Sequence, residues 1–163
     1  MPSTLWAPWR MAYIGGAQQG GCLLCALPGE LDDRKTLILH RRPLTYVVLN
    51  RYPYNNGHLM LVPFRHCADL SELSPAESLE LMLTAQRCIQ ALQGALHAEG
   101  FNVGFNLGRA AGAGILDHIH LHVVPRWVGD TNFMAVLADT KVMPDYLEAT
   151  YDKLVPLFQE QGR

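Results

Sequence analysis

The stretch Asp117-His118-Ile119-His120-Leu121-His122-Val123-Val124-Pro125 decides both the fold and the chemistry of this chain. Its three histidines alternate with apolar residues. Successive side chains of a β-strand point to opposite faces of the sheet, so the pattern predicts a strand over 117–125. One face would carry three imidazoles and the other would enter a hydrophobic core.

Such a row of imidazoles indicates a site for proton transfer, nucleophilic attack or metal binding, because an unpaired imidazole is costly to bury and titrates near neutral pH. The central His120 could attack phosphorus through an unprotonated ring nitrogen, while its other nitrogen donates to a backbone carbonyl. His122 could hold phosphate oxygens or help to protonate the leaving group. Metal binding is the competing interpretation, since adjacent members, about 6–7 Å apart, could share an ion.

The composition sets the class of protein. With 163 residues, 49% hydrophobic and 17% charged, the chain is expected to form one globular domain with a real core. A formal net charge of −2 gives no basic footprint for nucleic acid. No apolar run is long enough for a membrane span, and residues 1–10 lack a signal pattern, so we expect a cytoplasmic protein without a membrane partner.

The pair in Cys22-Leu23-Leu24-Cys25 has three interpretations: half of a zinc site, a redox pair or coincidence. A tetrahedral zinc needs two further ligands. His66 and His118 could supply them, which would leave His120 and His122 free for chemistry. Cys88 lies on an apolar helical stripe and is expected to be an inert buried thiol.

Other elements follow from local patterns. Residues 36–40 and 44–50 predict a β-hairpin, residues 51–56 predict a turn, and residues 57–63 and 101–107 predict two further strands. Ser74, Pro75 and Glu77 form a capping box that starts a helix, with Gly100 as its expected end. A final helix is expected over 144–161, kinked or interrupted by Pro156. Residues 5–14 read as an aromatic arm and residues 15–21 as a spacer.

The loop from Gly108 to Gly114 holds three glycines and three alanines and leads into the histidine stretch. A tight turn explains such a composition. Exposed backbone amides beside imidazoles can also cradle an anion, and the position of the loop favours this interpretation. The loop would then supply electrostatic stabilisation without net basic charge.

The chain resembles the histidine triad (HIT) family, because residues 118–124 match the motif His-φ-His-φ-His-φ-φ, where φ is apolar. The likeness covers roughly residues 36–130. It includes Asn50, the segment 57–63 with His66, and the segment 101–108. The arm 6–13 and the run 124–133 are similar to the diadenosine tetraphosphate (Ap4A) phosphorylase-like branch of that family.

The resemblance implies an α+β HIT-like fold with a five-stranded antiparallel sheet, one long helix and one C-terminal helix. Two chains would pair into a homodimer, or a higher homo-oligomer, with a continuous sheet. The whole chain, 1–163, would be one HIT domain. Within it, 1–35 would be an N-terminal arm with the CxxC pair, 36–130 the HIT core and 131–163 a C-terminal extension with a helix.

The resemblance also implies roles for individual residues. His120 would attack the α-phosphorus of an adenine dinucleotide and form a nucleotidyl-histidine, which water or phosphate would then resolve. Some bacterial members carry structural Zn²⁺ on the pattern of Cys22, Cys25, His66 and His118. The substrate would be contacted by His122 and His58 at phosphates, Asn50 at the ribose, Asn106 at the phosphate or nucleophile side, and the amides of Gly112 and Gly114.

Two departures affect the expected activity. Many family members carry Gln-Ser or Gln-Thr shortly before the triad, where this chain has Gly114-Ile115, and so it lacks a side-chain phosphate donor there. His122 stands where fungal-type phosphorylases carry Gln, which favours hydrolysis, whereas the flanking segments favour phosphorolysis. We expect an enzyme that cleaves Ap4A. The alternatives are a nucleotide-sensing protein with little turnover, a purine nucleoside phosphoramidase and a zinc-dependent hydrolase.

Overall fold

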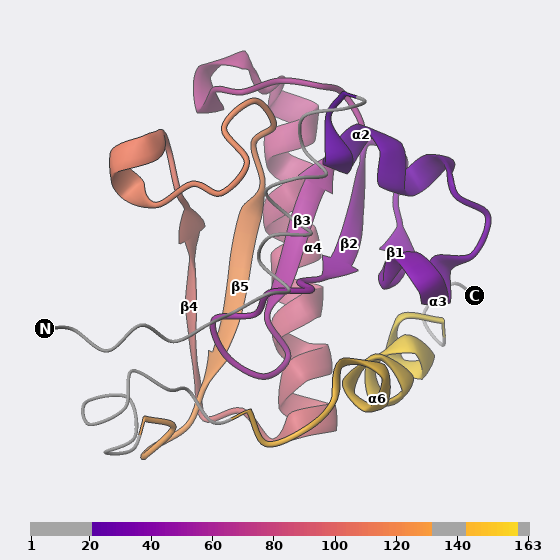
Figure 1. The fold of residues 1–163 in the computed structure, drawn as a ribbon, viewed down its shortest axis with the longest axis vertical. Coiled ribbons are helices and arrows are strands. Elements are labelled where there is room, and N and C mark those ends of the chain that lie inside the picture. The colour runs from indigo at the N-terminus through magenta and orange to yellow at the C-terminus, as the bar shows by residue number, and fades with distance from the viewer. Residues whose placement is uncertain (1–20, 132–142, 160–163) are drawn as a thin grey trace, which may run out of the picture.

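The computed structural model describes residues 21–131 and 143–159 (Figure 1). Their strands form one antiparallel five-stranded sheet in the order β1-β2-β3-β5-β4. The predicted sheet is therefore confirmed. The strands are β1 (Ile38–Arg41), β2 (Thr45–Leu49), β3 (Leu59–Pro63), β4 (Gly100–Phe105) and β5 (Leu121–Arg126). The predicted arm over residues 5–14 lies outside the described residues.

The central strands are buried on both faces. Every residue of β2 is buried, and β3 is buried except for the partly exposed Met60. The long helix α4 (Pro75–Leu96) packs on β2, β3 and β5 and crosses behind the sheet in Figure 1. Burial of these aliphatic side chains supplies the main stabilisation of the fold. The largest fully buried side chains include Tyr46, Leu59, Leu61, Leu81, Leu92, Leu154 and Phe158.

The start of α4 is as predicted, and its end is not. The Ser74 side chain accepts from the Glu77 amide, and the Glu77 carboxylate accepts from the Ser74 amide. The helix ends at Leu96, not near Gly100, and His97 takes the left-handed conformation (φ 53°). The Trp127 indole donates to the carbonyls of Leu96 and His97. These carbonyls at the C-terminal end of the helix therefore have a hydrogen-bond partner before the chain reaches Gly100. Gly100 instead opens β4.

The C-terminal helix is α6 (Leu147–Gln159), and it packs on α4 and β1. Of the kink or interruption predicted at Pro156, the interruption is wrong, because Pro156 lies inside the continuous helix. Leu154 and Phe158, on either side of it, are buried in the core. Their packing offsets the backbone hydrogen bond that proline cannot make.

The histidine stretch is only partly a strand. β5 begins at Leu121, so His118 and His120 precede it, and only His122 pairs in the sheet, opposite Met60 and Gly104. The amide of Ile119 donates to the carbonyl of Cys67 at 2.7 Å, a contact to a loop beyond β3. This contact holds the chain ahead of β5 against that loop. The predicted strand over 117–125 is therefore too long at its start.

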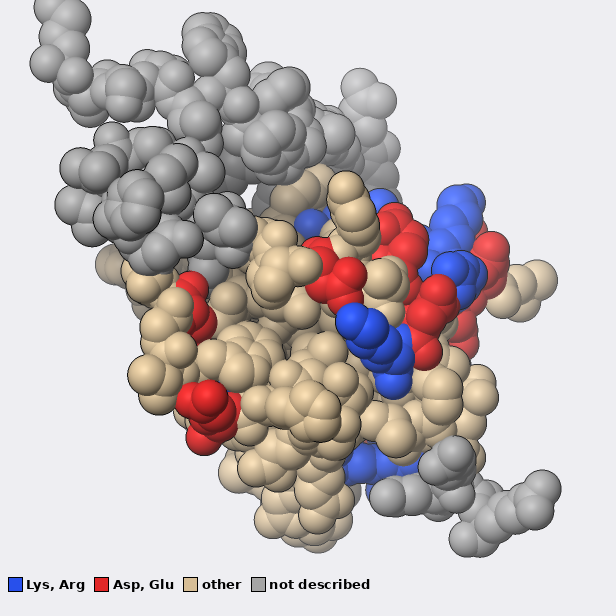
Figure 2. Space-filling view, turned by 90° about the horizontal axis from the view of Figure 1, so that it is seen from below, with Lys and Arg blue, Asp and Glu red and all other residues tan. Residues whose placement is uncertain are grey.

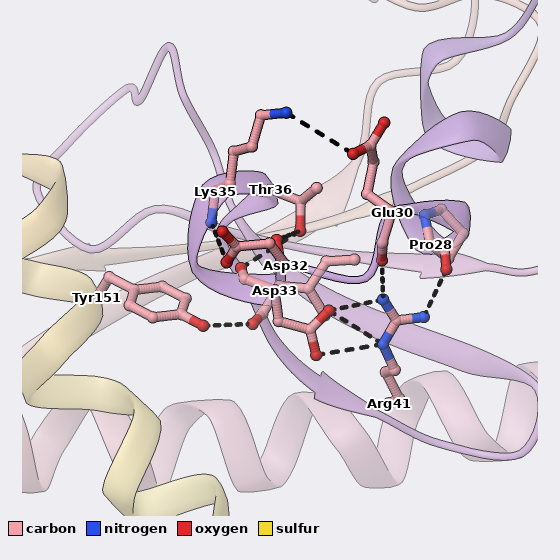
Figure 3. A network of polar contacts seen from close by, with 9 residues as sticks. Pro28, Glu30, Asp32, Asp33, Lys35, Thr36, Arg41 and Tyr151 are labelled. Carbon is pink, nitrogen blue, oxygen red and sulfur yellow. Dashed lines mark hydrogen bonds and ion pairs between the residues drawn. The ribbon is translucent and has the colours of Figure 1, made fainter.

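Short helices fill the connections. They are α2 (Leu23–Ala26), α3 (Asp33–Thr36) and three 3₁₀ turns, Leu27–Gly29, Leu70–Glu72 and Arg109–Ala111. Arg41 fastens the first of these connections to β1: its guanidinium donates to the carbonyls of Pro28 and Glu30 and pairs with Asp33 (Figure 3). These contacts fix the segment that follows the cysteine pair.

The surface agrees with the modest net charge. On the face drawn in Figure 2, acidic and basic side chains lie side by side in one cluster, and much of the rest carries no charge. This face therefore has no extended basic patch for nucleic acid. No helix among residues 21–131 and 143–159 combines the length and apolarity that a membrane crossing requires.

Candidate active site and metal cluster

His120 has the hydrogen bonding of a nucleophile. Its Nδ1 lies 2.8 Å from the carbonyl oxygen of His118. A carbonyl only accepts, so Nδ1 carries the hydrogen and Nε2 is the bare nitrogen of the neutral ring. The His120 side chain is 6% exposed, and Nε2 makes no hydrogen bond within the described part of the chain. The unprotonated nitrogen that the sequence predicts is therefore defined by one backbone contact.

His58 orients His122 through a hydrogen bond between their rings. Nε2 of His58 lies 2.8 Å from Nδ1 of His122, and His58 is fully buried. The backbone amide of Tyr54 donates to Nδ1 of His58 at 3.0 Å. Since Nδ1 of His58 accepts, its Nε2 must carry the hydrogen and donate to His122. His122 then carries its own hydrogen on Nε2, from which it can donate a hydrogen bond to an oxygen anion.

This arrangement changes the role expected for His58. Both of its ring nitrogens are already hydrogen bonded inside the protein. Asn50 adds its side-chain amide at 3.3 Å from the same Nδ1. A phosphate contact by His58 would require breaking one of these bonds. We therefore treat His58 as a residue that positions His122, and a direct substrate contact by it stays an untested prediction.

Burial keeps the triad neutral at pH 7. Burial lowers the pKa of His120, although the hydrogen bond to the His118 carbonyl opposes the shift. Burial, and to a smaller extent the charge of His120, lowers the pKa of His122 to about 4. A neutral imidazole is the form that can attack phosphorus. The electrostatics thus agree with the hydrogen bonding: both favour the neutral form of His120 that the predicted attack on phosphorus requires.

The lowered pKa of His122 predicts that acid destabilises the fold. The unfolded chain binds a proton on this ring as the pH falls through 6.5, whereas the folded protein does so only near pH 4. The contribution of His122 to the free energy of unfolding is therefore fully present above pH 6.5 and declines by about 3 kcal/mol as the pH approaches 4. Urea unfolding at pH 7.5 and 4.5 measures this loss. His122→Gln should lose less over the same interval, and an equal loss in both proteins would contradict the assignment.

Asn106 and Tyr54 stand beside His122. The amide nitrogen of Asn106 lies 3.5 Å from Nε2 of His122 and 3.0 Å from the hydroxyl of Tyr54. The Tyr54 ring lies 4.6 Å from His58 and 5.5 Å from His122 between centroids. The sequence interpretation missed Tyr54, since residues 51–56 read as a turn. An aromatic residue four positions before His58 was the available signal.

Asn50 also lies at this site, on the His58 side. Its amide faces His58, and its side-chain oxygen accepts from the backbone amide of Tyr52. The structure thus brings together five of the predicted residues: His120, His122, His58, Asn50 and Asn106. A ribose contact by Asn50 stays a prediction.

The Gly108–Gly114 loop is turned partly on itself. The amides of Ala111 and Ala113 donate to the carbonyl of Gly108, and the amide of Gly112 donates to that of Arg109. Gly108 and Gly112 both have positive φ, +79° and +82°, which glycine adopts readily. Gly112 and Gly114 are exposed. Because the Gly112 amide is already satisfied, anion binding by this loop remains a prediction that the structure does not strengthen.

The four predicted metal ligands come together. The ligand atoms of Cys22, Cys25, His66 and His118 all lie within 4.8 Å of one another. Nδ1 of His118 is 3.2 Å from the sulfur of Cys22 and 3.4 Å from that of Cys25. Nε2 of His118 donates to the carbonyl of Pro63, so its Nδ1 is the bare nitrogen and faces the thiols. Two thiols and two imidazoles suit a tetrahedral zinc ion.

Contacts outside the cluster hold its ligands in place. The Tyr46 hydroxyl donates to the carbonyl of Leu24 at 2.6 Å, inside the turn between the two cysteines. The loop that carries His66 is fastened by Arg65, whose guanidinium pairs with Glu77 at the start of α4 and donates to the carbonyl of Glu72. The protein therefore positions these four candidate ligands, which come from three separate segments of the chain.

Comparison with known proteins agrees with this geometry. The model of the HIT domain matches residues 32–128. A protein named AP-4-A phosphorylase from Mycobacterium tuberculosis is 42% identical over 154 residues, which cover 90% of this chain and 79% of that protein. A bifunctional bis(5'-adenosyl)-triphosphatase/adenylylsulfatase FHIT of Arabidopsis thaliana is 29% identical over 63% of this chain and 56% of its own.

Solved structures give the same result. A Zn-bound histidine triad family protein from Mycobacterium smegmatis superposes with a TM-score of 0.68 at 29% identity, covering 86% of this chain and 94% of that one. The predicted α+β HIT-like fold is thus confirmed. From the family model, the M. tuberculosis relative and the triad geometry together, we conclude that the chain belongs to the HIT family.

Proposed function

We propose that this protein cleaves dinucleoside polyphosphates, with Ap4A as substrate, through a nucleotidyl-histidine on His120. The observation that carries the proposal is the bare, neutral Nε2 of His120, fixed by the bond from Nδ1 to the His118 carbonyl. The 42% identical relative named AP-4-A phosphorylase supports the substrate class.

The chemistry has two steps. In the first, a bond forms between Nε2 of His120 and the α-phosphorus, and the bond from that phosphorus to the bridging oxygen breaks, releasing ATP. In the second, an oxygen of the acceptor attacks the same phosphorus, and the bond to His120 breaks. The hydrogen on Nε2 of His122 stabilises the charge that builds on oxygen in each step. Phosphate as acceptor gives ADP, and water gives AMP.

We propose phosphate as the acceptor, because the M. tuberculosis relative is named a phosphorylase and the match to it covers 90% of this chain. Product analysis after incubation of Ap4A with and without inorganic phosphate tests this choice. ADP and ATP should form when phosphate is present, with the phosphate oxygen recovered in ADP. Formation of AMP and ATP at the same rate in both reactions would identify a hydrolase, and the absence of any cleavage would contradict the proposed function itself.

We further propose a structural zinc ion on Cys22, Cys25, His66 and His118. The cluster supplies four protein ligands, which is the full coordination of a structural site and leaves no position for a reacting water. A Zn-bound family member with the same fold supports the choice of metal. When bound, the ion would serve to join the N-terminal segment to the residues that precede β5. No catalytic step is assigned to it.

A homodimer with a continuous sheet completes the proposal. Among the strands that the structure describes, β4 is an edge strand paired only with β5, and three of its residues are exposed, including Val103 at 43%. An exposed edge of this kind offers unpaired backbone groups to a second copy. Sedimentation equilibrium should give twice the mass of one chain, and Val103→Pro should reduce it to that of one chain. A monomeric wild-type protein would refute the dimer.

A further inference from the structure

The loop between β2 and β3, residues 50–58, is held rigidly although much of it is irregular. The Asn55 amide donates to the carbonyl of Pro125 and to the carboxylate of Asp130. Asn56 accepts from the hydroxyl of Thr150 on α6, and both side chains are buried. Gly57 has φ +76°, and a Cβ there would meet the Leu96 side chain at 2.5 Å. The loop therefore presents its side chains at fixed positions.

Tyr54 is the solvent-facing residue of this loop at the active site. Its side chain is 48% exposed, whereas His58 and His122, against which its ring packs, are 0% and 7% exposed. Its backbone amide is bonded to His58. Both ends of Tyr54 are therefore tied to the catalytic group, the backbone through His58 and the hydroxyl through Asn106.

The hydroxyl of Tyr54 is placed next to the hydrogen-donating end of His122. The single amide nitrogen of Asn106 lies 3.0 Å from that hydroxyl and 3.5 Å from Nε2 of His122. The ring of His122 is also 4.7 Å from that of His120. Ring contacts thus run from the nucleophile His120 to His122 and on to Tyr54. A substrate whose α-phosphorus meets His120 reaches Tyr54 only when its next phosphates extend along this row.

We propose that Tyr54, together with Asn106, binds the phosphates that follow the attacked phosphorus, and so selects substrates with a polyphosphate chain. This inference rests on the proposed function. A phenol and an amide are neutral, so they can hydrogen bond phosphate oxygens without added positive charge, consistent with a chain of net charge −2. The phenol ring packs on two imidazoles while its polar end reaches Asn106, which favours a role for the hydroxyl.

The test compares Tyr54→Phe on two substrates that share the attacked phosphorus. Ap4A continues into further phosphates, whereas adenosine 5′-phosphoramidate does not. Tyr54→Phe keeps the ring contacts and removes only the hydroxyl, so kcat/KM on Ap4A should fall about 10- to 100-fold, the range for one hydrogen bond to a charged group. On the phosphoramidate it should stay within about twofold. Tyr146→Phe, at a tyrosine 83% exposed on the C-terminal segment, is the matched control and should match wild type on both.

Two results would overturn the inference. An equal loss on both substrates would mean that Tyr54 supports the histidines and does not read the phosphate chain. Unchanged kcat/KM on both would mean that the hydroxyl has no role in the reaction. Failure of the wild-type protein to cleave either substrate is a separate outcome, which would contradict the proposed function before Tyr54 is considered.

Discussion

Replacing His120 with alanine or asparagine is expected to abolish turnover of Ap4A, with a loss of kcat of at least about 10⁴-fold. The structure gives the reason: Nε2 of His120 is the bare nitrogen of a neutral ring, and its ring neighbour His122 carries its hydrogen on Nε2. Asparagine can still donate to the His118 carbonyl, so this variant separates loss of the nucleophile from loss of packing. Steady-state release of ATP measures the effect.

His97→Asn is the matched control for that experiment. His97 is an exposed histidine at the end of α4 in the left-handed conformation, which asparagine tolerates well. Its activity should equal that of wild type. Turnover of His120→Ala or His120→Asn within tenfold of wild type would show that another group attacks the phosphorus.

Removal of one metal ligand should have the largest effect on stability. Cys22→Ser replaces a thiolate with a weak ligand, so the protein should lose its zinc, measured as about one ion per chain in wild type by elemental analysis. The three segments that the cluster joins would then keep only their protein–protein contacts, among them those of Tyr46 and Arg65. We expect the melting temperature to fall by about 10 °C or more, equivalent to several kcal/mol at this chain length.

Cys88→Ala provides the control for the zinc experiment. Cys88 is fully buried in α4, and burial raises the pKa of its thiol well above the usual value, as predicted for an inert core cysteine. This variant should keep one zinc per chain and lose only about 1 kcal/mol, as a small core truncation does. Zinc retained in Cys22→Ser, with an unchanged melting temperature, would contradict the assignment of the ligands.

A single residue connects the two sites. The bare ring nitrogen of His118 points at the thiols. The backbone carbonyl of the same residue accepts a hydrogen bond from Nδ1 of His120, and so Nε2 of His120 is unprotonated. The candidate metal cluster and the proposed nucleophile therefore share one stretch of backbone. Under the proposed function, the first histidine of the triad can thus bind the metal without removing the second from catalysis.

Much of the fold and of the candidate site was predictable from the sequence, because local composition and residue spacing determine these features. The β-rich composition of residues 44–50 and 57–63 predicted the strands β2 and β3, and the capping box at Ser74 predicted the start of α4. The two cysteines and His66 lie far from His118 in the chain, so residue types alone made a zinc site one of three interpretations. The resemblance to the HIT family then favoured the ligand set that the structure brings together.

The missed features depend on contacts between distant segments. The early end of α4 follows from the Trp127 indole, which lies 30 residues from His97. The late start of β5 accompanies the bond from Ile119 to Cys67, which joins the histidine stretch to another loop. Tyr54 looked like a turn residue because only the folded loop brings it to Asn106. Local sequence patterns do not encode such pairings.

The most direct test of the account is to isolate the covalent intermediate. Wild-type protein quenched in alkali during turnover of Ap4A, then digested and analysed by mass spectrometry, should carry an adenylyl group on Nε2 of His120. The group should disappear in acid and be absent from His120→Asn. An adenylyl group on another residue, or rapid turnover with no adduct at any quench time, would contradict the central claim that His120 is the nucleophile.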